Sequence, residues 1–89
     1  MALTYKISTF EAELDSSDNP TGKKNVGFEV TDDSDKSIYL INKAIEIGSK
    51  SDDEITDEAY TASKAQVDAW AAAKANIGKT FDPTSKKIT

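Results

Sequence analysis

The sequence contains no cysteine, no histidine and no arginine. Without cysteine and histidine, the chain offers no disulfide bonds, no thiolate or imidazole metal ligands and no Cys- or His-based nucleophilic machinery. All eleven basic residues are lysines, so the planar guanidinium that binds phosphate or carboxylate through two hydrogen bonds is also missing. These absences argue against phosphate chemistry and against most nucleophilic catalysis.

Acidic residues outnumber basic ones by sixteen to eleven, which gives a net charge of −5 and a pI near 4.6. A negative surface repels nucleic acid and anionic membranes, so we expect neither as a partner. No apolar run approaches the roughly 18 residues that span a bilayer, and the opening MALTYKIST lacks the charged and apolar regions of a signal peptide. We therefore expect a soluble protein that is cytoplasmic when synthesised.

The length of 89 residues sets the predicted domain organisation. A chain this short buries little more than half of its unfolded surface and does not divide into two cores, so residues 1–89 are predicted to form a single domain. Hydrophobic residues make up 37% and charged residues 30% of the chain, which is a richer apolar content than a disordered chain of this charge has. We expect a folded protein with a thin core.

The first half of the sequence has the alternation typical of β-strands. Leu3, Tyr5 and Ile7 share one parity, whereas Phe10 falls on the other, so the apolar face changes between Ile7 and Phe10. A β-bulge or a bend would reconcile the two halves. The run DSSDNPTGKK, residues 15–24, is dense in turn formers and predicts an exposed loop.

Two further strands are predicted after this loop. The segment NVGFEVT, residues 25–31, alternates cleanly with Phe28 on its apolar face, and the run DDSDK that follows it suits a hairpin loop. Residues 38–47 begin with apolar side chains on both parities, which is typical of a central strand. Residues 2–47 therefore predict a small antiparallel sheet of three or four strands, with residues 38–47 in its middle.

A long helix is predicted from about residue 56 to 77. Two residues compete for its N-cap: Ser51, with Glu54 three residues later, fits a capping box, whereas Thr56 precedes two acids that favour the positive end of a helix. We favour Thr56, with Gly78 as the natural residue to end the helix.

One side of this helix carries its large apolar residues. At about 100° per residue, Val67, Trp70 and Ile77 fall within one arc, which we expect to pack across the sheet. Lys74 falls in the same arc, and we expect its methylene groups to cover apolar surface while its ammonium stays in water. The predicted core anchors are Trp70, Val67, Ile77 and Phe28.

The fold class predicted from these elements is α+β, a small antiparallel sheet of three or four strands with one long C-terminal helix packed across it. The segment KTFDPTSKKIT, residues 79–89, is polar and contains a proline, so we expect an extended tail. Phe81 is its one large side chain in a position to anchor it.

Four alanines recur on the opposite side of the predicted helix, at i, i+3, i+7 and i+10: Ala62, Ala65, Ala69 and Ala72. One interpretation is that alanine, the best helix former, fills a solvated face. The other is that a row of small residues lets a second helix approach closely, which would make the row an assembly surface in a protein with a thin core. The second interpretation predicts a protein partner, in a homo-oligomer.

Carboxylates, lysines, hydroxyls and tyrosines are the main groups available for catalysis. Glu11 and Glu13 lie on one strand face and Glu29 could sit opposite them, which is the nearest approach to a carboxylate pair. Polar residues at alternate strand positions are far more often the wet side of a sheet. We therefore predict that the chain is not an enzyme and needs no cofactor.

The acidic loops raise a second chemical hypothesis, because DSSDN and DDSDK concentrate the oxygen ligands that Ca²⁺ prefers. The first candidate ligands are Asp32, Asp33 and Asp35, but neither run has EF-hand spacing, and such clusters also form turns through bonds to the local backbone. A small ligand- or calcium-binding module is the alternative function. A third, an acidic mimic of DNA, is disfavoured because the acids are spread over loops, a strand face and both sides of the helix.

The opening TYKIS, the strand-rich first half and the late helix EAYTASKAQVDAWAAAKANIG resemble, in layout, small uncharacterised proteins encoded by bacteriophages, particularly marine ones. The similarity covers most of the chain, includes no diagnostic motif and carries over no functional residues. It implies a virion component or a small accessory protein. The function that we expect is structural or interaction-based, as a subunit of an assembly.

Overall fold

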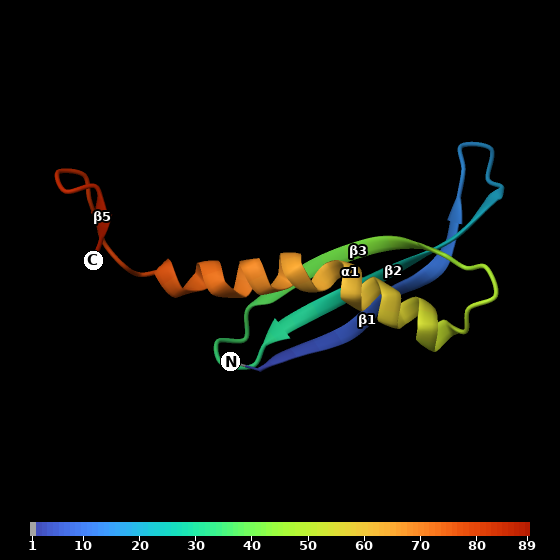
Figure 1. The fold of residues 1–89 in the computed structure, drawn as a ribbon, viewed down its shortest axis with the longest axis horizontal. Helices are drawn as coiled ribbons and strands as arrows, with labels where there is room; N and C mark the ends of the chain where they lie inside the picture. The colour runs from blue at the N-terminus through green and yellow to red at the C-terminus, as the bar shows by residue number, and fades with distance from the viewer. Residues whose placement is uncertain (1) are drawn as a thin grey trace.

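The computed structural model describes residues 2–89. A three-stranded antiparallel sheet carries one long helix on one face, and a short hairpin follows the helix (Figure 1). The prediction of an α+β fold is confirmed. In chain order, the elements are β1 (Leu3–Leu14), β2 (Pro20–Asp32), β3 (Ile38–Glu46), α1 (Asp52–Ala73), the 3-10 helix η1 (Lys74–Asn76), β4 (Phe81–Asp82) and β5 (Lys87–Ile88).

The three long strands are ordered β1–β2–β3, so β2 is central and the prediction that residues 38–47 lie in the middle of the sheet is wrong. The apolar residues on both parities of β3 explain the error. Tyr39 and Ile41 pack on the helix side, but Ile38 and Leu40 point to the other face and are 55% and 67% exposed. Two-sided apolarity in this strand therefore marks exposed surface rather than burial on both faces.

The register of the β1–β2 hairpin shifts between Ile7 and Thr9 of β1. One extra residue, Ser8, is inserted there, and it moves the helix-facing positions of β1 from odd to even numbers. Phe10 consequently packs against the core on the same side as Tyr5. The irregularity predicted between Ile7 and Phe10 is confirmed as a β-bulge.

The connection between β1 and β2 is shorter than predicted. Only residues 15–19 lie outside the strands, and the Asp15 carboxylate accepts hydrogen bonds from two backbone N–H groups within this turn. Pro20 opens β2, a strand-start position at which its missing N–H is tolerated. The prediction of an exposed loop over residues 15–24 is therefore right for its first half and wrong for its second.

Helix α1 begins one turn earlier than predicted, because the capping box at Ser51 prevails over Thr56. The Ser51 hydroxyl accepts a hydrogen bond from the Glu54 N–H at 3.2 Å, and the Glu54 carboxylate accepts one from the Ser51 N–H at 3.1 Å. Thr56 lies inside the helix, where its hydroxyl donates to the carbonyl of Asp52. The additional turn brings Ile55, which is 1% exposed, into the core.

The core lies between the sheet and the buried side of α1, which crosses β2 and β3. An amphipathic helix on the apolar face of a sheet is the two-layer arrangement that buries both surfaces. Val67 and Phe28, 0% and 3% exposed, are core residues as predicted. The buried apolar residues are Val26, Phe28, Val30, Ile41, Ile45, Ile55, Ala59, Val67 and Ala71.

The molecule is elongated, with a radius of gyration of 17.5 Å and principal extents of 56 × 28 × 17 Å. A compact domain of this length would have a radius of gyration of about 12 Å. In Figure 1 the tip of the β1–β2 hairpin projects at one end, and the last turns of the helix project with the C-terminal hairpin at the other. Across the described residues, no helix is both long and apolar enough to cross a membrane.

Residues 79–89 do not form the extended tail that was predicted, because β4 and β5 pair as a small hairpin. Ile77 is 78% exposed, so the prediction that it is a core anchor is wrong. Phe81, expected to anchor the C-terminal segment, is 58% exposed and is paired with Ile88 of the same hairpin. The helical period identifies a side of the helix but does not show where the sheet beneath it ends. The last turns of the helical segment extend beyond the sheet (Figure 1).

Candidate functional site

The three candidate calcium ligands, Asp32, Asp33 and Asp35, cluster where β2 turns into β3, but only two of them converge. Oxygens of Asp32 and Asp35 lie 2.5 Å and 3.2 Å from Nζ of Lys74. Asp33 instead accepts a hydrogen bond from the Thr4 hydroxyl on β1. The chain's own ammonium thus occupies the place of a cation. No group of three or more acidic side chains in the described chain is arranged to hold a metal ion.

Lys74 reaches this turn from the C-terminal end of α1. Its side chain is 11% exposed, donates to Oγ of Ser37 at 2.7 Å and places Nζ 4.2 Å from the ring centroid of Trp70. Trp70 in turn stacks on Tyr39, with ring centroids 5.2 Å apart. The prediction that the ammonium stays in water is wrong, because carboxylates of the turn replace the water. We refer to Asp32, Asp35, Ser37, Tyr39, Trp70 and Lys74 as the lysine clamp.

Trp70 was predicted to be a central core anchor, but it is only partly buried and packs at the edge of the core. The ring of Tyr39 stacks on Trp70, and the ammonium of Lys74 lies over the Trp70 ring. A cation over an aromatic face is attracted by the negative face of the ring. Trp70 therefore links the core to the lysine clamp rather than filling the middle of the core.

The electrostatics of the lysine clamp favour the charged forms of both partners. The hydrogen bond from Lys74, together with those from Ser34, holds the pKa of Asp32 well below its ordinary value. Burial acts to lower the pKa of Lys74, but its hydrogen bonds with Asp32 and Asp35 outweigh burial and raise that pKa overall. An ammonium held protonated in this way is neither a nucleophile nor a base at neutral pH. The clamp fastens the end of α1 to the β2–β3 turn.

The alanine row of Ala62, Ala65, Ala69 and Ala72 is exposed along α1. The row lies on the side of the helix opposite Ser63 and Val67, which are buried against the sheet. A solvated face and an assembly surface both require this exposure in the isolated chain. The exposure of the row is therefore compatible with both interpretations. The row is separate from the apolar surface at the end of the helix.

The residues that follow the helix expose large apolar side chains. We define residues 77–89 as the C-terminal arm. Ile77, Phe81 and Ile88 are 78%, 58% and 52% exposed. Phe81 and Ile88 are directly opposed in the β4–β5 ladder, so their side chains share one face of the hairpin. The arm therefore presents a small apolar knob.

The charge of the C-terminal arm is opposite to that of the rest of the chain. The arm contains three lysines and one aspartate, whereas residues 1–76 contain eight lysines and fifteen acids. The carboxylate of that aspartate, Asp82, already accepts hydrogen bonds from Thr84 and Ser85 within its own turn. None of the arm's lysines forms an ion pair within residues 2–89: Lys79, Lys86 and Lys87.

A groove of about 460 Å³ lies beside the first turns of α1. Because α1 crosses β2 and β3, the helix-side face of β1 is left open, and Ile7 there is 48% exposed. The ring of Tyr5 packs edge-on against Phe28 and Tyr60, with centroids 5.4 Å and 4.8 Å away. We call this the acidic groove, and its lining residues are Tyr5, Ile7, Phe28, Asp53, Thr56, Asp57 and Tyr60.

The two acids of the groove, Asp53 and Asp57, lie one helical turn apart and have no ion pair or side-chain hydrogen bond within residues 2–89. Neighbouring acids are different: Asp52 pairs with Lys24, and Glu58 pairs with Lys50. The sequence does not predict this groove, because the groove depends on which strands α1 covers and which strand it leaves open. The local signal was the pair of acids four residues apart beside an aromatic residue.

The chain matches no known family model, and comparisons with curated proteins and with solved structures found no similar one. The features that bear on function are therefore the lysine clamp, the C-terminal arm and the acidic groove.

Proposed function

We propose that this chain is a structural protein that acts by binding, as a subunit of a homo-oligomeric assembly. The observation that carries the proposal is the C-terminal arm, which holds Ile77, Phe81 and Ile88 beyond the sheet with more than half of each side chain exposed. Burying an apolar side chain of this size stabilises a complex by roughly 1.5–3 kcal/mol. The isolated chain gains less than half of this free energy, because more than half of each residue is exposed, and a partner that covers the arm would provide the rest.

The elongated shape supports the same proposal. The β1–β2 hairpin and the C-terminal arm project from opposite ends of the molecule, which suits a subunit that contacts neighbours on two sides (Figure 1). The lysine clamp supports it as well, because it fixes the end of α1 and thereby fixes the direction in which the arm leaves the sheet.

The setting that we propose is a bacteriophage virion or an accessory complex of a phage. The resemblance in layout to small phage proteins supports this setting. An assembly subunit needs complementary surfaces rather than catalytic groups, which agrees with a sequence that lacks cysteine, histidine and arginine.

Light scattering over a range of protein concentrations tests the proposal. The wild type is expected to have at least twice the chain mass of 9.6 kDa, and the double variant Phe81→Ser with Ile88→Ser is expected to have the mass of one chain. The matched control, Ile38→Ser with Leu40→Ser, removes similar exposed apolar side chains from the face of the sheet opposite the helix. It should keep the wild-type mass. A wild type that stays at one chain mass at every concentration would show that the proposal is wrong.

A further inference from the structure

The acidic groove and the C-terminal arm are complementary in both polarity and charge. The groove has an apolar floor that includes Tyr5 and Ile7, and a wall with two acids that have no partner in the described chain. The arm has an apolar pair, Phe81 and Ile88, next to lysines that likewise form no ion pair within residues 2–89. Each surface therefore supplies what the other lacks.

We infer that the C-terminal arm of one chain docks in the acidic groove of a second copy. Phe81 and Ile88 cover Tyr5 and Ile7, and the arm's lysines pair with the acids on the first turns of α1. This inference rests on the proposed function, since it names the contact that builds the assembly. The occupant is a second copy because the arm carries the charge and the apolar pair that the groove requires.

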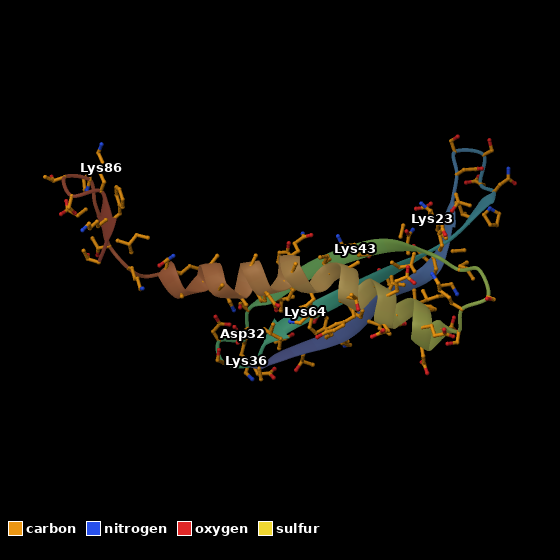
Figure 2. All side chains as sticks on the ribbon, viewed as in Figure 1. Lys23, Asp32, Lys36, Lys43, Lys64 and Lys86 are labelled. Carbon is orange, nitrogen blue, oxygen red and sulfur yellow. The ribbon has the colours of Figure 1, made fainter. Side chains whose placement is uncertain are left out.

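The arm does not reach the groove of its own chain. From Asp57 to the end of η1 at Asn76 the helix runs about 28 Å at 1.5 Å per residue. The connection over residues 77–80 spans at most about 14 Å and leads away from the sheet. In Figure 2, Lys86 of the arm lies at the opposite end of the molecule from Lys23, and Lys43 and Lys64 lie between them. Docking therefore occurs between chains.

The acids of the groove gain from such a contact. Asp53 and Asp57 are four residues apart on one side of α1, where like charges repel. Lysines brought by a second chain relieve this repulsion in a site that the apolar knob shields from water. Arm and groove are different surfaces, so two chains that exchange arms form a two-fold dimer, whereas a head-to-tail contact builds a closed ring or an open chain.

Charge reversal on each side tests this contact. The groove variant carries Asp53→Lys with Asp57→Lys, and the arm variant carries Lys86→Glu with Lys87→Glu. Each variant alone opposes like charges across the contact, so light scattering is expected to give one chain mass for each. In an equimolar mixture the wild-type arm meets the wild-type groove, and the reversed arm meets the reversed groove. The mixture is therefore expected to associate, and less so at high salt.

A matched control reverses two exposed acids outside the groove, Glu11→Lys with Asp18→Lys, and should keep the wild-type mass. Circular dichroism and Trp70 fluorescence establish that each variant is folded. If the wild type has one chain mass, the proposed function and this inference both fail. If the wild type is oligomeric but both charge variants remain oligomeric, or if monomeric variants fail to associate when mixed, this inference fails and the proposed function stands.

Discussion

The two ends of the helical segment carry the same residue type in opposite surroundings. Ile55, in the first turn of α1, is 1% exposed, whereas Ile77, just past the 3-10 turn, is 78% exposed. The difference arises from the sheet, because Ile55 packs in the core against it, whereas the last turns of the helical segment extend beyond it (Figure 1). The lysine clamp marks the boundary, because Lys74 makes the last side-chain hydrogen bonds that join the helical segment to the sheet and its β2–β3 turn within residues 2–89. Before the clamp, apolar residues stabilise the fold; after it, they are available for contact with a partner.

The largest expected change in stability comes from truncating one of these two isoleucines and not the other. Ile55→Ala removes buried methyl groups and leaves a cavity, which should lower the free energy of unfolding by about 2–5 kcal/mol. Ile77→Ala removes exposed groups and should change it by no more than about 0.5 kcal/mol. Urea denaturation measures both, in the background of Lys86→Glu with Lys87→Glu so that assembly does not contribute. Equal losses at the two positions would mean that the arm packs on its own chain.

The next largest change in stability is expected when the ion pair of the lysine clamp is removed. The folded pKa of Asp32 lies below its unfolded value of about 3.9, so its ionised carboxylate contributes stability at neutral pH that is lost as the pH falls below about 4. Asp32→Asn should therefore lower the melting temperature at pH 7, by less than Ile55→Ala does, and the difference from wild type should shrink in acid. The neighbouring Asp33→Asn is the matched control, because Asp33 is exposed and, within residues 2–89, its carboxylate accepts a hydrogen bond only from the Thr4 hydroxyl. Identical pH profiles for Asp32→Asn and wild type would argue against the clamp.

Local patterns in the sequence predicted the features of the fold that depend on residues close together in the chain. The change of parity between Ile7 and Phe10 predicted the β-bulge, and the helical period placed Val67 on the buried side of α1. The capping box at Ser51 was visible in the sequence, but two caps competed, and the choice of Thr56 left Ile55 out of the core.

The remainder depends on which elements meet in space. Asp32 and Lys74 are 42 residues apart, and neither the turn nor the helix predicts the ion pair between them. The acidic groove exists because α1 lies over β2 and β3 and leaves β1 open, which no residue of the helix determines alone. The order of the strands also depends on which elements meet, and Ile38 and Leu40 are exposed because the helix covers only the other face of the sheet.

A smaller change in stability, in this case a gain, is expected on the buried side of α1. Ser63 is 1% exposed, and its hydroxyl has no hydrogen-bond partner in the described chain. A buried hydroxyl without a partner costs about 1–3 kcal/mol, and alanine is also the better helix former. Ser63→Ala should therefore raise the free energy of unfolding by about 1 kcal/mol or more. The control Thr61→Ala is exposed and should gain only the difference in helix propensity, so equal gains would mean that Ser63 is satisfied by water.

The smallest effect is expected on the solvent side of the helix, in the alanine row. Ala69 is exposed, and glutamate is also a good helix former, so Ala69→Glu should change the free energy of unfolding by no more than about 0.5 kcal/mol. If assembly uses the arm and the groove, the mass measured by light scattering should also be unchanged. The alternative is that the row packs against a second helix. The new carboxylate would then be buried without a partner, which is strongly disfavoured, and the oligomer would dissociate. Loss of mass in Ala69→Glu, with the charge variants of the arm and groove still oligomeric, would move the interface from the end of the helix to its solvent side.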